Sequence, residues 1–541
     1  MEARTIPTCK HLFGGAAALL VVLPLPALAD TPNVAAYLKA RAADADGRSE
    51  VAVAGYARAL SSAPGDAKLA VRAFREALAA GDMTLASRAA AILRTQGEVP
   101  ADVALLAIGE AAQANDPGAA ERGVAALDRT PLGILSPAVR GWIASAKGVD
   151  PMPVLGRAAV RPDPLAQRFA NETRALLLIA RGDTAQGLAA VAAARSAGAP
   201  ADLSVAAAQL LFGRGQEAEA RALLDGDDPV VVAMRRGYPA KPTLAFGVSR
   251  LFGRVAADLA GGDSPSAIAI ALSRSALVAD PTDGRARLLL ADALARDGGT
   301  DRALATLAKL DRDDPFAAAA QANRVAILAA AGRSDEALAA AKALATREGA
   351  VAADWQRYGE QLTLAGQYAE AARWYRRVLD ADAAREPWTA WMQYGGALDQ
   401  AGRWAEAKPA LERAVKLAPD EPLALNYLGY ARAERGDDVR NATRLLERAA
   451  ALAPDNASIA DSLGWVYFLG GNIAKALPLV ERAAAAEPDN AEIAEHLGDI
   501  YWSVGRRYEA RYAWRAAAVV AEPDEATRLA GKVASGLPTQ R

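Results

Sequence analysis

The sequence predicts an all-α protein built as an α-solenoid, a right-handed superhelix of antiparallel helix pairs. Apolar residues make up 52% of the chain but aromatic residues only 6%, and alanine is the commonest apolar residue. Alanine has the highest helix propensity and lets helices pack closely. Turn-forming residues recur roughly every 34 residues, and no segment shows the alternating pattern of a strand. Such a period indicates stacked helix pairs rather than one compact core.

The repeat is clearest near the C-terminus. SLGWVYFLGGNIAKAL (462–477) and EHLGDIYWSVGRRYEA (495–510) match at an offset of roughly 34 residues. The matched residues are Leu463, Gly464, Tyr467, Gly471 and Ala476 with Leu497, Gly498, Tyr501, Gly505 and Ala510. The turn positions predicted along the chain are Gly81, Asp116, Gly148, Gly182, Gly215, Gly262, Gly298, Gly332, Gly366, Gly402, Gly436, Gly471 and Gly505.

Each unit is predicted to contain two helices joined by a glycine turn. A glycine inside the first helix lets the second helix approach where any side chain would hold it away. Small residues recur in the second helix, and prolines separate the units because proline cannot continue a helix. The repeat positions with this structural role are Gly395, Gly429, Gly464 and Gly498; Ala407, Ala476 and Ala510; and Pro419, Pro454 and Pro488.

The first residues have the features of a secretory signal. A slightly basic start precedes an apolar run from Leu12 to Val22, and Ala27-Leu28-Ala29 forms a small-residue cleavage site before Asp30. A retained anchor is the alternative, but glycines and prolines interrupt the run. We therefore expect an exported, periplasmic protein without a transmembrane segment in the mature chain. The single cysteine, Cys9, would be removed, which leaves neither disulfides nor a lipidation site.

Five segments are expected along the chain. The C-terminal half repeats clearly, the N-terminal half keeps the period but loses its aromatic residues, and the period widens between them. We interpret the wide interval as an irregular joint between two arms of one superhelix. The segments are a signal peptide at 1–29, degenerate repeats at 30–225, the joint at 226–262, the regular array at 263–522, and a capping helix with a tail at 523–541.

No constellation of residues predicts catalysis, a metal site or a cofactor. His496 is the one histidine of the mature chain, and without cysteine a zinc site around it would need three carboxylates. We therefore expect an ordinary histidine on a helix surface or in a groove. The formal net charge of −2 argues against a nucleic-acid-binding protein.

A binding surface is easier to predict. In solenoids of this kind the first helices line the concave face, and aromatic residues there are the usual anchors of interfaces. Packing in the repeat core is the alternative role, which we favour for Trp391, Trp404 and Trp514. The remaining residues would form an acidic, aromatic groove for an extended or helical peptide with basic residues. The predicted partner-binding residues are Asn426, Tyr430, Asp461, Trp465, Phe468, Glu495, Asp499 and Trp502.

Three stretches resemble a known family. Trp391–Asp420 (WMQYGGALDQAGRWAEAKPALERAVKLAPD) is similar to the tetratricopeptide repeat. Asp461–Ala517 and Ser266–Leu294 resemble a narrower group, exported proteobacterial proteins of this family. Its best understood members are outer-membrane lipoproteins that bind a C-terminal processing protease and deliver substrates, including cell-wall hydrolases, to it. Those scaffolds carry a lipidated cysteine at the mature N-terminus, where this chain has Asp30.

The resemblance implies a non-enzymatic periplasmic adaptor that binds proteins or peptides through its concave face, with delivery to a processing protease as the specific case. Any outer-membrane placement would then come from a partner. The alternative is a scaffold for exopolysaccharide or outer-membrane assembly and secretion machinery. An enzyme that uses the repeats as its scaffold is the remote alternative, because no compact domain interrupts the period. The oligomeric state stays open.

Overall fold

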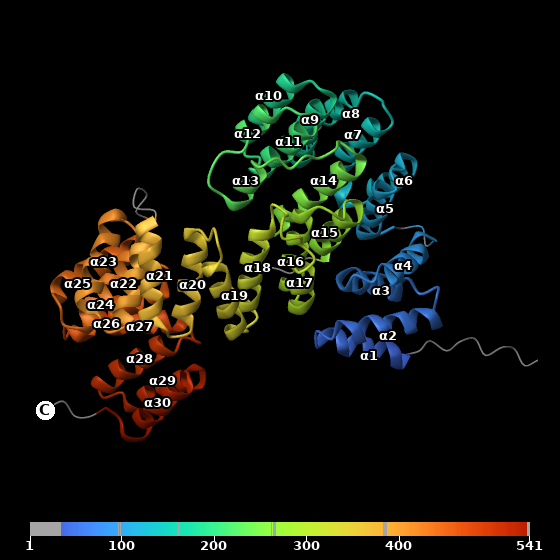
Figure 1. Ribbon diagram of the computed structural model, residues 1–541. Coiled ribbons are helices and arrows are strands. Elements are labelled where there is room, and N and C mark those ends of the chain that lie inside the picture. Colours follow the sequence, from blue (N-terminus) through green and yellow to red (C-terminus); the bar gives the residue numbers. More distant parts are fainter. Residues whose placement is uncertain are drawn as a thin grey trace, which may run out of the picture. The chain divides into compact units, whose positions relative to one another are not determined.

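The computed structural model describes residues 34–95, 97, 99–159, 163–260, 262, 267–381 and 387–537. Every regular element in these ranges is a helix, as Figure 1 shows. The predicted all-α class is therefore confirmed. None of the helices in these ranges has the length and apolar character needed to cross a membrane. The predicted signal peptide at 1–29 lies outside the described residues.

The chain divides into two compact units, each described here by itself. Unit 1 contains the described residues up to 310 together with 314–316. Its helices are α1 (Val34–Ala45), α2 (Ser49–Ser62), α3 (Ala67–Ala80), α4 (Met83–Thr95), α5 (Ala101–Gln113), α6 (Pro117–Leu127), the short 3-10 helix η1 (Pro131–Leu135), α7 (Ser136–Ala146), α8 (Met152–Ala159), α9 (Pro164–Arg181), α10 (Thr184–Ser196), α11 (Asp202–Gly213), α12 (Glu217–Ala222), α13 (Pro229–Met234), α14 (Leu244–Leu259), α15 (Ala267–Ala279), α16 (Gly284–Arg296) and α17 (Thr300–Leu307).

Unit 2 contains residues 311–313 and the described residues from 317 onward. Its helices are α18 (Ala317–Ala330), α19 (Ser334–Thr346), α20 (Ala352–Leu364), α21 (Tyr368–Ala381), α22 (Trp388–Gln400), α23 (Trp404–Leu417), α24 (Pro422–Glu434), α25 (Val439–Leu452), α26 (Ala457–Leu469), α27 (Ile473–Ala486), α28 (Ala491–Ser503), α29 (Arg507–Val520) and α30 (Pro523–Ser535). From α20 to α29 the even-numbered member is the first helix of a pair and the odd-numbered member is the second.

In unit 1, helices that are far apart in the sequence pack against each other, which the repeat period did not predict. Helix α15 packs against α5 and α3, and α14 packs against α5 and α7. Gly109 of α5 allows the close approach, because a Cβ there would lie 2.6 Å from the carbonyl oxygen of Ser275 in α15. Arg274 of α15 donates from Nε to the carbonyl oxygen of Leu78 at 2.8 Å, near the end of α3. The end of α3 thus receives a cation, which suits the negative end of a helix dipole.

The segment at 226–262 is more regular than the expected joint. It contains α13 and the 16-residue helix α14. Trp142 of α7 lies against α14, since a Cβ on Gly247 would stand 2.0 Å from its ring. Every residue of α14 from Phe246 to Ala256 is buried, so packing on several sides stabilises this helix. The segment limits proposed from the sequence stay a prediction.

The turn residues behave as expected at all but two positions. The other turn glycines have positive φ angles, from 62° at Gly436 to 100° at Gly182. A left-handed backbone of this kind favours glycine. Gly262 is not among the residues with positive φ, and near Asp116 the left-handed residue is Asn115, with φ of 49°. Asp116 instead caps α6 by accepting from the backbone N–H groups of Gly118 and Ala119 at 2.9 Å.

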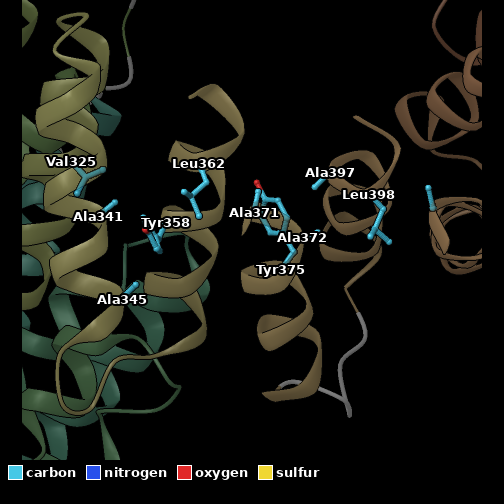
Figure 2. Close-up of a cluster of buried hydrophobic side chains, with 11 residues drawn as sticks. Val325, Ala341, Ala345, Tyr358, Leu362, Ala371, Ala372, Tyr375, Ala397 and Leu398 are labelled. Atoms are coloured by element: carbon cyan, nitrogen blue, oxygen red, sulfur yellow. The ribbon is translucent and has the colours of Figure 1, made fainter. Parts of the chain in front are cut away.

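Unit 2 is a stack of antiparallel helix pairs with a core shared between neighbours. Figure 2 shows part of this core, where side chains from α18 to α23 follow one another from helix to helix. Tyr358 and Leu362 of α20 meet Ala371 and Tyr375 of α21, and the same cluster continues to Leu398 of α22. Each pair therefore buries its apolar face against the next pair, as in other solenoids.

The small residues of the repeat lie where two helices come closest. A Cβ on Gly464 would be 2.5 Å from Cγ2 of Val480, and one on Gly498 would be 2.4 Å from Cδ1 of Trp514. Gly395 and Gly429 meet a leucine of the second helix in the same way, at 2.7 Å and 2.8 Å. Side chains at these positions would separate the helices. The second-helix residues Ala407, Ala476 and Ala510 are fully buried, and Pro419, Pro454 and Pro488 lie in the turns between pairs.

Candidate functional site

A pocket in unit 2 is bordered by the first helices of four successive pairs. It has a volume of about 630 Å³ and is lined by residues of α22, α24, α26 and α28, by Arg435, which follows α24, and by Asn490, the residue that caps α28. We call it the first-helix pocket. Three predicted binding residues lie in it, namely Asn426, Tyr430 and Asp461. The other lining residues are Asp399, Gln400, Tyr427, Ala431, Glu434, Arg435, Ser458, Ser462, Asn490, Glu492 and Ile493.

The local sequence explains how these side chains reach the pocket. Asn456 caps α26 by accepting from the backbone N–H of Ile459 at 3.0 Å, and Asn490 caps α28 by accepting from that of Ile493 at 3.3 Å. The caps start both helices at matching places in the repeat. Asp461 of α26 and Glu492 of α28 border the same pocket, with Glu492 nearly one helical turn closer to the start of its helix than Asp461.

An aromatic cluster lies beside the pocket. Trp465 stacks on His496, with ring centroids 4.0 Å apart and an angle of 13° between the planes. Phe468 lies 5.1 Å from Trp465 by the same measure, and Nε1 of Trp465 donates to Glu434. Tyr430 donates from its hydroxyl to Glu492 at 2.6 Å. The predicted residues Trp465 and Phe468 thus adjoin the pocket without lining it.

His496 is more buried than expected. Only 7% of it is exposed, so the first of the two expected positions, the helix surface, is wrong, and the residue lies buried between Trp465 and Asp461. Its Nδ1 lies 2.8 Å from Oδ2 of Asp461, in the preceding first helix. Burial by itself lowers the pKa of His496, but the hydrogen bond to Asp461 and the nearby carboxylates outweigh that effect, so the pKa is raised. His496 consequently ties α28 to α26 and holds one oxygen of Asp461 in place.

The far end of the predicted groove is filled by the chain itself. Lys532 of α30 donates to Glu495 and, at 2.7 Å, to Oδ2 of Asp499. Arg528 donates to Glu495 through both terminal nitrogens of its guanidinium group. Burial raises the pKa of Glu495, but the hydrogen bonds from Arg528 and Lys532 outweigh that effect and lower it to about 2. These two carboxylates are neutralised within the chain, so this end differs from the open acidic groove that we expected.

Trp502 is also covered by residues near the C-terminus. A Cβ on Gly536 would lie 1.9 Å from its ring, and the guanidinium group of Arg507 stands 4.3 Å from its ring centroid. Trp502 therefore packs against the segment that follows α30. Trp514 is fully buried and donates to Asp499 at 2.8 Å, as expected of a core residue.

Sequence reasoning missed several residues of the pocket. Glu434 lies one helical turn beyond Tyr430, and Glu492 lies one turn before His496 in α28. Each lies one turn along its helix from a residue that the sequence had already drawn attention to, and on the same face, so the helical period could have identified both. Arg435 could not, because its side chain reaches back to Asp399 of the preceding first helix. Within the described ranges, no group of three or more His, Cys, Asp or Glu side chains is placed to hold a metal ion.

The fold and the pocket define a helical repeat protein whose first helices form a polar pocket. Two family models, each described as a tetratricopeptide repeat, match residues 388–433 and 462–526. Both matches lie within the stacked helix pairs of unit 2, so this part of the chain is similar to tetratricopeptide repeats. The predicted fold, an all-α tetratricopeptide solenoid, is confirmed. Neither model is that of an enzyme, and this fold is generally a non-catalytic scaffold for protein interaction.

Solved structures with local similarity are described as tetratricopeptide-repeat proteins or as MamA. A thermophilic repeat protein from Thermus thermophilus is 24% identical over 34% of this chain and 100% of its own, with a TM-score of 0.31. One from Parabacteroides merdae is 16% identical over 46% and 98%, with a TM-score of 0.41. MamA is 25% identical over 32% and 96%, with a TM-score of 0.25. Comparison with curated proteins gives no match.

Proposed function

We propose that the protein is a non-enzymatic adaptor that binds a segment of a partner protein in the first-helix pocket. The observation that carries the proposal is the pocket itself, which is bordered by four successive pairs and has a volume of about 630 Å³. Tyr427 and Tyr430 offer aromatic surface there, and Asn426 offers a hydrogen-bonding amide. A few polar groups placed among aromatic side chains are typical of peptide-recognition sites.

The cellular role that we propose is that of a periplasmic scaffold. The support is the signal-like segment at 1–29 and the resemblance of Asp461–Ala517 to exported scaffold proteins. In this proposal the pocket holds either a C-terminal processing protease or a substrate that is delivered to it. Because Asp30 replaces the lipidated cysteine of those scaffolds, any attachment to the outer membrane would depend on the partner.

Site-specific photo-crosslinking tests the proposal in cells. A photoreactive phenylalanine analogue replaces Ser458, an exposed residue that lines the pocket. The control carries the same analogue at Tyr508, which is 81% exposed on α29 and does not line the pocket. We expect partner crosslinks from position 458 and few from position 508, with the products identified by mass spectrometry.

The identity of the crosslinked protein decides the cellular role. A processing protease or cell-wall hydrolases at position 458 would support the scaffold for proteolysis. Components of polymer export or outer-membrane assembly would instead support the alternative scaffold. Equal crosslinking from both positions would contradict partner binding in the first-helix pocket.

A further inference from the structure

The first-helix pocket has an excess of carboxylates. Among its described lining residues four are acidic, and Arg435 is the one basic residue. Arg435 is already engaged, because its guanidinium group lies 2.5 Å from Oδ1 of Asp399. Glu434 accepts from the indole of Trp465, and Glu492 accepts from the hydroxyl of Tyr430. Neither of these neutral donors removes the negative charge, so the pocket favours a cation.

Two buried acceptor atoms in the pocket find no donor in the part of the chain that the structure describes. Asp461 is only 4% exposed, and its Oδ2 is held by His496. Among the described residues its Oδ1 has no hydrogen-bond partner, and neither has Oδ1 of Asn426. A buried acceptor without a donor destabilises a protein, because its hydrogen bond to water is lost and not replaced. Both residues line the pocket, so a ligand that enters it can supply the N–H groups that these two atoms lack.

The chain itself shows which kind of side chain suits the neighbouring positions. In α28, Glu495 stands at the repeat position equivalent to Asp461 in α26, since each lies three residues before its repeat glycine. Glu495 is bound by Arg528 and Lys532, which lie on α30 at the spacing of one helical turn. One repeat earlier, the corresponding contact to Asp461 comes from His496, which holds Oδ2, and Arg435 is the one basic residue among the described residues that line the pocket.

We propose that the first-helix pocket binds a lysine or arginine side chain of a partner segment, with Oδ1 of Asp461 and Oδ1 of Asn426 as acceptors. This inference rests on the proposed function and specifies the chemistry of the partner. Glu434 and Glu492 attract the cation at the rim, and the Tyr430 ring borders its aliphatic stem. Partner segments with a basic residue are then selected over acidic ones, because further negative charge would meet the carboxylates.

A displayed library of random peptides, selected on the intact chain, tests the inference. We expect lysine or arginine to be enriched in the selected peptides. Synthetic copies in which the basic residue is replaced by norleucine should bind about tenfold more weakly or worse, because a charge-assisted hydrogen bond is lost. Affinity should also fall as salt is raised.

Matched variants place the effect in the pocket. Glu492→Gln removes one charge from an exposed residue, and Asp461→Asn removes the buried acceptor charge. The control, Asp489→Asn, removes a charge from an exposed position in the turn before α28. We expect weaker binding of basic peptides to the first two variants and unchanged binding to the control. Because Asp461→Asn also alters the contact with His496, Glu492→Gln keeps the test valid if the other variant fails to fold.

The two proposals fail in different ways. Peptides that crosslink at position 458 but bind equally well as norleucine versions would overturn the cation site and leave partner binding in the pocket intact. Peptides that bind the chain without crosslinking at position 458 would overturn both. If Glu492→Gln and Asp489→Asn lose affinity equally, the loss comes from the net charge of the protein and not from the pocket. This result would also overturn the cation site.

Discussion

Replacing Gly498 by alanine should destabilise the last helix pair, although alanine is the better helix former. A Cβ at this position would lie 2.4 Å from both Cδ1 and Nε1 of Trp514. The indole is fully buried and its Nε1 donates to Asp499, so the ring has little room to move. Contact distances this short require the neighbour to shift, and here the neighbour is a rigid ring in a close-packed core.

Two opposing effects determine the magnitude. Alanine gains about 1 kcal/mol over glycine in helix propensity. Overpacking a filled core typically destabilises by about 1–3 kcal/mol, and the constrained indole of Trp514 places this site near the upper limit. The expected net change is therefore a loss of about 2 kcal/mol, which increases the population of locally opened α28 and α29 by about thirtyfold.

Gly531 provides the matched control. It lies on the exposed side of α30, and no heavy atom of the described chain comes within 4 Å of a Cβ built there. Gly531→Ala should therefore stabilise α30 by about 1 kcal/mol, which is the helix-propensity gain alone. The same substitution, glycine to alanine, is thus expected to lower stability at position 498 and to raise it at position 531.

Amide hydrogen exchange is the suitable assay, because it reports local opening in a chain with two units that need not unfold together. Gly498→Ala should speed exchange in α28 and α29, while Gly531→Ala should slow it in α30. If Gly498→Ala slows exchange as Gly531→Ala does, the glycine is not needed for close helix packing and the explanation of the repeat pattern is wrong.

Three further predictions concern charge. His496→Gln should remove a pH-dependent part of the stability of unit 2. Because the pKa of His496 is raised in the folded state, that part is present below about pH 6.5 and is lost as the pH rises through the raised value. The melting temperature should therefore fall over this pH range in the wild type and change less in the variant. Lys532→Met leaves two carboxylates without their shared cation and should destabilise the docking of α30 by about 3 kcal/mol, seen as faster exchange in α30 with α18 to α21 unchanged. Burial, and then Asp44, raise the pKa of Glu76 to about 7, so Glu76→Gln should stabilise unit 1 above that pH and have little effect near pH 4.5; equal effects at both pH values would contradict this.

The candidate site was predictable in part. Asn426, Tyr430 and Asp461 follow from their distance to the repeat glycines, because residues at the same helical register face the same side. The role of Glu495 and Asp499 was not predictable. The sequence shows two carboxylates, but their charges are neutralised only because α30 folds back and brings Arg528 and Lys532 to them. The burial of His496 likewise depends on Trp465, which is contributed by the preceding first helix.

The helical class, the repeat and most of the turns follow from the order of the residues alone. These features depend on contacts within a helix or between neighbouring helices, and such contacts leave a period in the residues, as at Gly464 and Gly498. In contrast, the packing of α15 against α5 and α3, and the neutralisation of one end of the groove by α30, are seen only in the folded chain. Arg274 and Leu78 are 196 residues apart in the chain, and a contact at that separation leaves no local pattern. The first-helix pocket depends on both kinds of contact. Its helices follow the repeat, but the acceptors of Asp461 and Asn426 lack a donor because of how the neighbouring described side chains pack in three dimensions.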